Sequence, residues 1–321
     1  MAFETETVLD RRRLRRRISW WRALAVVAAL AVVAVLVFSS REGAGFGRKQ
    51  IARVSVEGLI TEDRDQLRML QKIAKSDRVA AVIVFVNSPG GTTTGGEALF
   101  DALRKLSAAK PVVAQFGTIA TSAAYIAGLA TDQIVARGNT ITGSVGVIFQ
   151  WAEVSELLDK LGVKVNEVKS GPLKANPSPF QPLDAGGKAV AEQMVAESQK
   201  WFVGLVTTRR NIDPKSVNGL EQGRIFSGRE ALTYKLVDQI GGEAEAIKYL
   251  EDARHVPAGL KVVDWKPQRV EGWGLMSLAT HAVASLLGLH GSGRVADLLA
   301  AQGVRTLQLD GLVSIWHGSE N

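Results

Sequence analysis

The chain has 321 residues, of which 46% are hydrophobic and 22% are charged, and its formal net charge is +7. This length accommodates one large domain or two modest ones. The absence of cysteine excludes a thiol nucleophile, disulfide bonds and thiolate metal sites. All four histidines lie beyond residue 250 without metal-ligand spacing, so we predict no metal site.

The first forty residues have the pattern of a membrane anchor. Six arginines lie within Asp10–Arg17, and an uninterrupted apolar run, Ala23–Phe38, follows them. With its flanks, a helix over 18–40 is long enough to cross about 30 Å of hydrocarbon. Since arginines stay on the cytoplasmic side, we predict a cytoplasmic basic tail over 1–17 and an uncleaved transmembrane signal anchor over 18–40. A cleaved signal peptide is the alternative.

Beyond a glycine-containing linker over 41–49, strand-like and helical segments alternate. Such alternation is typical of an α/β fold with a largely parallel sheet. In chain order we expect a strand over 51–60, a helix over 63–77, a strand over 78–91, a helix over 97–110, a strand over 111–117, a helix from residue 122, strands within 133–150, a helix and then a strand within 154–171, a Pro-rich loop over 171–183 and a long helix over 186–211.

The last part of the chain changes character. A short strand and a capped helix are expected over 223–242, with Ser227 and Glu230 in capping-box spacing. Residues 266–321 are expected to form a helical extension of unknown role. Within it, residues 272–290 favour a helix that lies on a membrane surface or against a partner, because glycine and histidine interrupt the apolar pattern.

Three glycine-bearing or small-residue turns follow predicted strands, namely Asn87–Gly91, Thr121–Tyr125 and Thr142–Gly146. Parallel α/β sheets place their sites at the carboxyl ends of strands, so these turns can converge on one crevice. Ser122 lies where a strand passes into a helix, and helix N-terminal amides can stabilise a developing oxyanion. Ser122 is therefore the candidate nucleophile.

A serine nucleophile needs a base, and histidines confined to the C-terminal region are poor candidates. A Ser–Lys dyad remains, and Lys174 is the best lysine because it lies in a loop framed by glycine and proline. A lysine with a pKa near 10.4 is almost entirely charged at pH 7. A dry, apolar site must therefore lower that pKa before Lys174 can accept the Ser122 proton.

Four segments, VNSPGG, the Ser122 turn, TGSVGVI and KSGPLKANPSPF, occur in an order and spacing that resemble the signal peptide peptidase A (SppA) family. The resemblance is to the short, single-repeat form of these membrane-anchored Ser–Lys serine proteases, and it covers roughly residues 50–250. It implies a ClpP/crotonase-like core, with a parallel sheet and flanking helices, over 50–265. It assigns roles to six residues: nucleophile Ser122, general base Lys174, Ser144 to orient the lysine, and oxyanion-hole amides from Gly90, Gly91 and Ala123.

The family commonly has Gly-Gly after the nucleophile, whereas this chain has Ala123-Ala124. Alanine would be strained if that position needed a positive φ, and favourable if it begins a helix. We expect the second case.

The resemblance also implies a homo-oligomeric ring in which each site takes serine and lysine from neighbouring subunits. The expected function is a single-pass inner (cytoplasmic) membrane endopeptidase with its N-terminus inside, its catalytic domain extracytoplasmic and its substrates cleaved signal peptides and similar short unfolded segments. Substrates are expected to bind as an added strand, and no cofactor or nucleic-acid partner is expected. The alternatives are a SohB-like peptidase, a non-catalytic membrane scaffold and a crotonase-type acyl-CoA enzyme.

Overall fold

The computed structural model describes residues 20–22, 24–27, 30, 49–268 and 311–315. The chain divides into two units, Met1–Arg48 and Lys49–Asn321. Within the described residues, no helix combines the length and the apolar character that a bilayer crossing requires. The anchor predicted over 18–40 lies mostly outside the described residues and stays a prediction.

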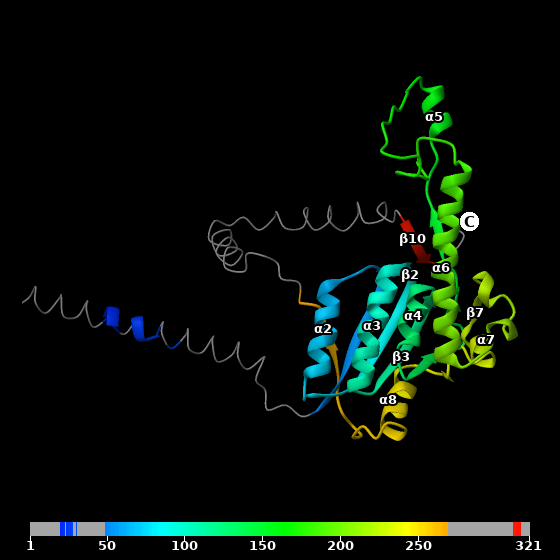
Figure 1. Ribbon diagram of the computed structural model, residues 1–321. Coiled ribbons are helices and arrows are strands. Elements are labelled where there is room, and N and C mark those ends of the chain that lie inside the picture. The colour runs from blue at the N-terminus through cyan, green and yellow to red at the C-terminus, as the bar shows by residue number, and fades with distance from the viewer. Residues whose placement is uncertain (1–19, 23, 28–29, 31–48, 269–310, 316–321) are drawn as a thin grey trace, which may run out of the picture. The chain divides into compact units, whose positions relative to one another are not determined.

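The second unit is built on a ten-stranded sheet (Figure 1). The main path of the sheet has the order β6-β10-β2-β3-β4-β8, with β1 and β9 continuing from β2, and with β5 and β7 continuing from β3. Pairing is parallel except where β10 meets β2 and β6 and where β5 meets β7. The strands are β1 (Gln50–Ile60), β2 (Val79–Thr92), β3 (Val112–Thr121), β4 (Gln133–Ala136), β5 (Ile141–Gly143), β6 (Ile148–Gln150), β7 (Ile225–Ser227), β8 (Gln239–Ile240), β9 (Val262–Trp265) and β10 (Gly311–Ile315).

Helices cover both faces of this sheet. The α-helices are α2 (Arg64–Lys75), α3 (Thr93–Ala109), α4 (Ala123–Leu129), α5 (Ser155–Lys160), α6 (Ala185–Arg210), α7 (Gly228–Thr233) and α8 (Glu243–Asp252), and two 3-10 turns are η1 (Pro214–Ser216) and η2 (Leu220–Gln222). One buried cluster joins the sheet to α2, α3, α4 and α6, and a second joins its other face to α8. The sheet is therefore a central layer, as the α/β expectation required.

Strand β2 illustrates why the sequence forms such a layer. Its residues Val82, Val84 and Val86 belong to the first cluster, whereas Ala81 and Ile83 belong to the second. Successive side chains of a strand point to opposite faces, so a strand buried on both sides is apolar throughout. The unbroken run VAAVIVFV follows from this double burial.

The expected helix at 97–110 begins earlier than predicted. Helix α3 starts at Thr93 because the Thr92 hydroxyl accepts a hydrogen bond from the Gly95 N–H at 3.0 Å. Gly95 and Gly96 then form the first turn, where a Cβ on Gly95 would lie 2.7 Å from the Thr61 carbonyl carbon. Close packing explains glycines that the helical pattern did not favour.

Two other expectations differ from the structure. The strand expected before the Pro-rich loop is absent from residues 161–169, which have no regular structure, and Val163, Val165 and Val168 are exposed without a neighbouring strand. The helix expected over 272–290 lies outside the described residues. Residues 311–315 of the extension expected to be helical form strand β10.

Candidate active site

Ser122 lies at the junction of β3 and α4 in an unusual backbone conformation. Its φ is 60° and its ψ is −124°, and it is the N-cap residue of α4. A positive φ is uncommon for a non-glycine residue and persists only when the surroundings enforce it. A strained serine at a sharp strand-to-helix turn is the geometry by which α/β hydrolases present a nucleophile.

Backbone and side-chain hydrogen bonds hold the Ser122 turn from both sides. The Ser122 N–H donates to the Gly143 carbonyl at 2.9 Å, and the Thr121 hydroxyl donates to the Pro89 carbonyl at 3.0 Å. The Ser144 N–H donates in turn to the Arg224 carbonyl at 2.9 Å. The three turns predicted to converge are therefore neighbours, at the carboxyl ends of β2, β3 and β5.

The alanine that follows Ser122 takes a helical conformation. Ala123 is the first residue of α4 and is completely buried. A Cβ added to Gly96 of α3 would lie 3.2 Å from the Ala123 side chain, so the two helices approach closely here. The Ala-Ala pair that departs from the SppA pattern therefore requires no positive φ.

The two glycines of the first turn differ in their surroundings. Gly90 has a φ of 114°, and its N–H donates to the Ser88 hydroxyl at 3.1 Å. Gly91 lies against β1, where a Cβ would be only 1.8 Å from the Ile60 carbonyl oxygen. The Gly90 amide thus already has a partner, and an oxyanion role for it requires exchange of that bond.

Ser144 lies close to this turn in a similarly constrained loop. Its φ is 51°, the φ of Gly143 is 86°, and Ser144 is 8% exposed. From the flanking helix α6, the Gln199 amide nitrogen donates to the Val145 carbonyl at 3.1 Å. Gln199 Oε1 is buried without a hydrogen-bond partner among the described residues.

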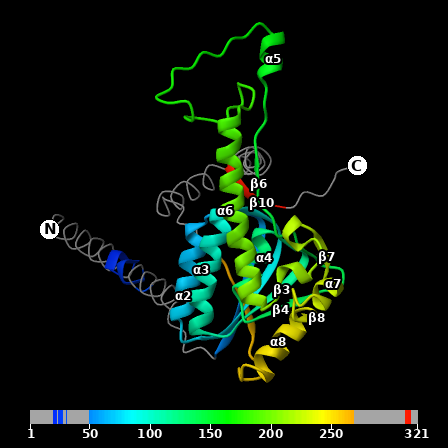
Figure 2. The ribbon, with the colours of Figure 1, turned by 45° about the vertical axis from the view of Figure 1, so that its right-hand side comes forward.

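Lys174 lies in the segment between α5 and α6, which stands apart from the sheet in both views (Figures 1 and 2). Lys174 is exposed, and its backbone N–H donates to the Gly171 carbonyl at 3.1 Å. Ala175 follows with a φ of 55°. A single chain thus assembles Ser122, Ser144 and the glycine turn, but does not bring the lysine segment to them.

Strand β10 pairs with the first turn, near Ser122, and sequence reasoning did not locate it. Strand β3 leaves β2 after Ser88 pairs with Ala120, and β10 takes the vacated side of β2 from Gly90 onward. On its other side β10 pairs with β6. The sequence of β10, GLVSI, is short and does not alternate, so it did not predict a strand.

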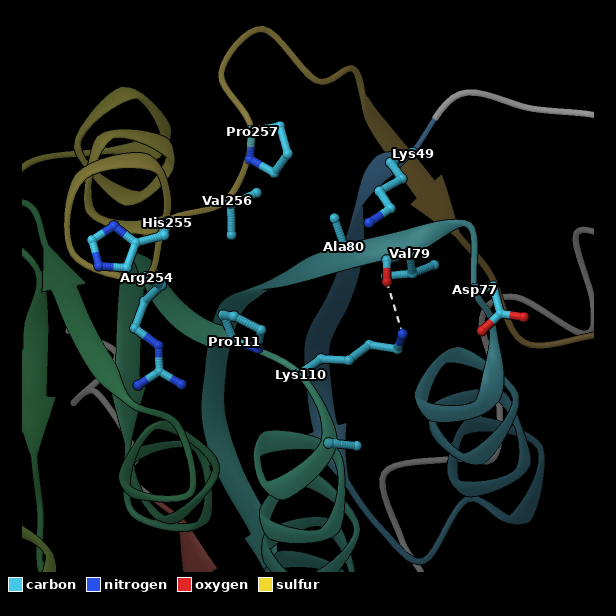
Figure 3. A pocket seen from close by; sticks show the side chains of 11 residues that line it. Lys49, Asp77, Val79, Ala80, Lys110, Pro111, Arg254, His255, Val256 and Pro257 are labelled. Atoms are coloured by element: carbon cyan, nitrogen blue, oxygen red, sulfur yellow. Dashed lines mark hydrogen bonds between the residues drawn. The ribbon is translucent and has the colours of Figure 1, made fainter.

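The pocket in Figure 3 lies at the opposite ends of the strands, where β1, β2 and β3 begin. It has a volume of about 370 Å³ and is lined by Lys49, Lys110, Arg254 and His255, among others. The Lys110 ammonium donates to the Ser76 and Val79 carbonyls, and Arg254 is paired with Asp132. These charges tie the chain together, and the pocket is not part of the Ser122 site.

A strained serine beside glycine amides on a parallel sheet defines the class of serine hydrolases. The family model of peptidase family S49 matches residues 104–257, and that of Clp protease matches residues 53–138. The chain is 35% identical to a provisionally named protease of Synechocystis sp. over 70% of this chain and 78% of that protein. It is 32% identical to a provisionally named signal peptide peptidase SppA of Enterococcus faecium, over 69% of this chain and 68% of that protein.

The chain therefore belongs to peptidase family S49, and it is a serine peptidase related to SppA. The chain is also 30% identical to a provisionally named protease of Methanocaldococcus jannaschii, over 72% of this chain and 80% of that protein. Family membership favours peptide hydrolysis over the acyl-CoA chemistry and the silent scaffold that the fold alone left open.

Proposed function

We propose that the chain is an endopeptidase in which Ser122 is the nucleophile and Lys174, from a neighbouring copy, is the general base. The observation that carries the proposal is the strained Ser122 turn, since strain of this kind collects at catalytic positions. Ser144, which is proposed to orient the lysine, and Ala175, which follows Lys174, also have a positive φ.

The reaction follows from the proposed roles. Ser122 Oγ attacks the scissile carbonyl while the neutral Lys174 amine accepts its proton. The oxyanion accepts hydrogen bonds from Gly91 and Ala123 amides, and from Gly90 after its bond to Ser88 exchanges. Lys174 then donates the proton to the leaving amine. A water molecule then gives a proton to the Lys174 amine and attacks the acyl-enzyme carbonyl; the ester bond to Ser122 Oγ breaks, and Lys174 returns the proton to that oxygen.

A neighbouring copy would supply the burial that this mechanism requires. An ammonium in water stays charged at neutral pH, and only a desolvated amine can act as a base. The region around Lys174 exposes apolar side chains suited to an interface: Leu157, Leu161, Val163, Val165, Val168, Leu173 and Phe180. Apolar patches on a projecting segment often mark protein–protein contacts. Packing of this segment on the next copy would bury Lys174 near that copy's Ser122 and Ser144.

The substrates we propose are extended peptides, including cleaved signal peptides released at the inner membrane. The name of the Enterococcus faecium relative supports this class. The pairing of β10 with β2 and β6 supports binding of an extended backbone at this edge, because a peptide can add to such strand edges through main-chain hydrogen bonds. An anchor over 18–40 would hold the domain at the extracytoplasmic surface, where such peptides leave the membrane.

The decisive experiment measures hydrolysis of a fluorogenic signal-peptide substrate by the full chain. We expect Ser122→Ala and Lys174→Ala each to lower kcat by at least about 10³-fold. Lys164→Ala is the matched control, since Lys164 is an exposed lysine in the same projecting segment, and it should retain activity within about twofold. Activity that survives either dyad substitution would refute the assignment. Labelling of Ser122 by a fluorophosphonate provides an independent measure of its nucleophilicity.

A further inference from the structure

Strand β3 is bulged shortly before the proposed nucleophile. Its pairing with β2 is regular as far as Val86 opposite Phe116, and it resumes with Ser88 opposite Ala120. Strand β3 therefore advances by four residues where β2 advances by two, and residues 117–119 form the bulge. Across the same residues β3 exchanges its other neighbour, β4, for β5. Bulges beside active sites can re-aim a side chain, so this one bears on how the serine is presented.

The side chain of Asn87 holds the bulge from β2. Asn87 Oδ1 accepts the Thr118 N–H at 3.1 Å and the Ile119 N–H at 3.3 Å. Because both groups are donors, the amide must turn its oxygen and not its nitrogen toward them. A Cβ on Gly117 would lie 3.1 Å from this oxygen, so β3 passes close to it. Asn87 thus links the two strands where their regular pairing is interrupted.

Threonine side chains hold the bulge from the opposite side. The buried Thr140 hydroxyl donates to the Gly117 carbonyl at 2.7 Å and accepts the Arg137 N–H at 3.1 Å. Just beyond the bulge, the Thr142 hydroxyl donates to the Ala120 carbonyl at 2.7 Å. The bulge is therefore fixed by side-chain hydrogen bonds from both of its neighbours in the sheet.

The bulge is joined directly to the strained serine. Only Ala120 and Thr121 separate Ile119 from Ser122, whose N–H donates to the Gly143 carbonyl at 2.9 Å. A bulge that relaxes would shift the end of β3 and move the Ser122 hydroxyl relative to the amides proposed to bind the oxyanion. A misplacement of about 1 Å in a catalytic site can lower a rate on the order of 10²-fold.

We propose that Asn87 is a positioning residue for Ser122, because its side-chain oxygen holds the β3 bulge in the form that presents the nucleophile. This inference rests on the proposed function and adds a residue that acts through the backbone of β3. Loss of the acceptor would displace the nucleophile and leave the contacts that bind substrate in place. The effect should therefore fall on kcat and not on KM.

The kinetic test compares Asn87→Ala, which removes the acceptor, with Asn87→Asp, which keeps an acceptor in nearly the same volume. Asn87→Ala should lower kcat for the fluorogenic peptide by about 10–100-fold and change KM by less than about threefold. Asn87→Asp should stay within about fivefold of the parent's kcat, and the control Thr118→Ala, which keeps its main-chain donor, within about twofold. Full activity of Asn87→Ala, a loss that Asn87→Asp shares, or a change in KM alone would overturn the proposal.

Amide hydrogen exchange separates this inference from the proposed function. In Asn87→Ala the Ser122 amide, which donates to Gly143, should exchange at least about tenfold faster than in the parent, and in Asn87→Asp at the parent's rate. The Gly187 amide, held by Asp184 at the start of α6, is the internal control. Faster exchange at Ser122 supports positioning even if no chain cleaves peptide, which would refute only the proposed function. Unchanged exchange at Ser122 overturns positioning.

Discussion

Ser122 combines a strained backbone with a buried environment. A non-glycine residue held in such a sparsely populated backbone conformation is strained by about 1–3 kcal/mol. The surrounding bonds, from the Ser122 N–H to Gly143 and from the Thr121 hydroxyl to Pro89, offset that cost by fixing the turn at both ends. Strain at this position is therefore a product of the neighbouring β2 and β5 turns.

Gly91 gives a sharp test of how closely β1 approaches the first turn. A methyl group there would lie 1.8 Å from the Ile60 carbonyl oxygen, so the strands must separate. We expect Gly91→Ala to lower the free energy of unfolding by more than about 2 kcal/mol. Urea denaturation followed by circular dichroism measures the change.

Gly204 is the matched control for this substitution. It lies within α6, and a Cβ there would meet nothing within 4 Å. Gly204→Ala should raise the free energy of unfolding by up to about 1 kcal/mol, because alanine is the better helix former. Equal effects of the two substitutions would contradict the packing described for Gly91.

At the scale of elements, Tyr125 joins α4 to the loop before β8. Its hydroxyl donates to the Leu236 carbonyl at 2.8 Å, and burial raises the pKa of this phenol above its usual value. Tyr125→Phe should lower stability at pH 7 by about 1–2 kcal/mol, because the buried carbonyl loses its partner.

The raised pKa of Tyr125 also predicts a pH dependence. The neutral phenol contributes stability that is fully present below the unfolded pKa of about 10 and is lost as pH rises toward the higher folded pKa. The melting temperature of the parent should therefore fall more steeply above pH 10 than that of Tyr125→Phe. Parallel curves would show that the phenol ionises as easily in the folded chain as in the unfolded one.

Asp184 is the N-cap residue of α6 and links this helix by hydrogen bonds to the segment that contains Lys174. Its carboxylate accepts from the Gly187 N–H and from the Asn176 side chain, both at 2.7 Å, and these bonds lower its pKa. The stability they contribute is present above the usual pKa and is lost as pH falls through the lowered one. Hydrogen exchange should show the Gly187 amide losing protection below about pH 4. In Asp184→Asn that protection should be weaker at pH 7 and independent of pH.

The sequence predicted most elements because their patterns follow from burial within one chain. Strand β2 is apolar throughout since both faces are covered, and Asp63 caps α2 as its residue type favours. The strand expected around Val163–Val168 does not form, because no described part of the same chain buries these residues. Its apolar residues are exposed in one chain, so their pattern cannot reflect packing within that chain.

Only the part of the site that follows from the fold class was predictable from the sequence. The Ser122, Ser144 and Gly90–Gly91 turns converge because parallel strands end at one edge, a rule that follows from the fold class alone. Strand β10 was not predicted, and it pairs with residues more than 150 positions away in the sequence. Neither pattern nor propensity specifies a pairing between segments so distant in the chain.

At the scale of the whole molecule, the proposed Ser122–Lys174 dyad makes one chain an incomplete enzyme. Ser122 and Ser144 belong to the compact α/β body, whereas Lys174 lies on an exposed projecting segment (Figure 2). The proposed dyad therefore needs two copies, and a closed ring would provide one such contact for every copy by repeating a single heterologous interface. Isolated chains should be inactive, and dilution should lower specific activity.

The most direct measurement mixes two inactive chains. Ser122→Ala supplies only the lysine and Lys174→Ala only the serine, so neither should cleave the fluorogenic peptide alone. After the two are unfolded together and refolded at equal ratio, neighbouring copies can combine an intact serine with an intact lysine. We predict recovery of about a quarter of the parent's activity, the statistical share of complete sites. A mixture as inactive as its components, with the parent active under the same conditions, would contradict a dyad shared between copies.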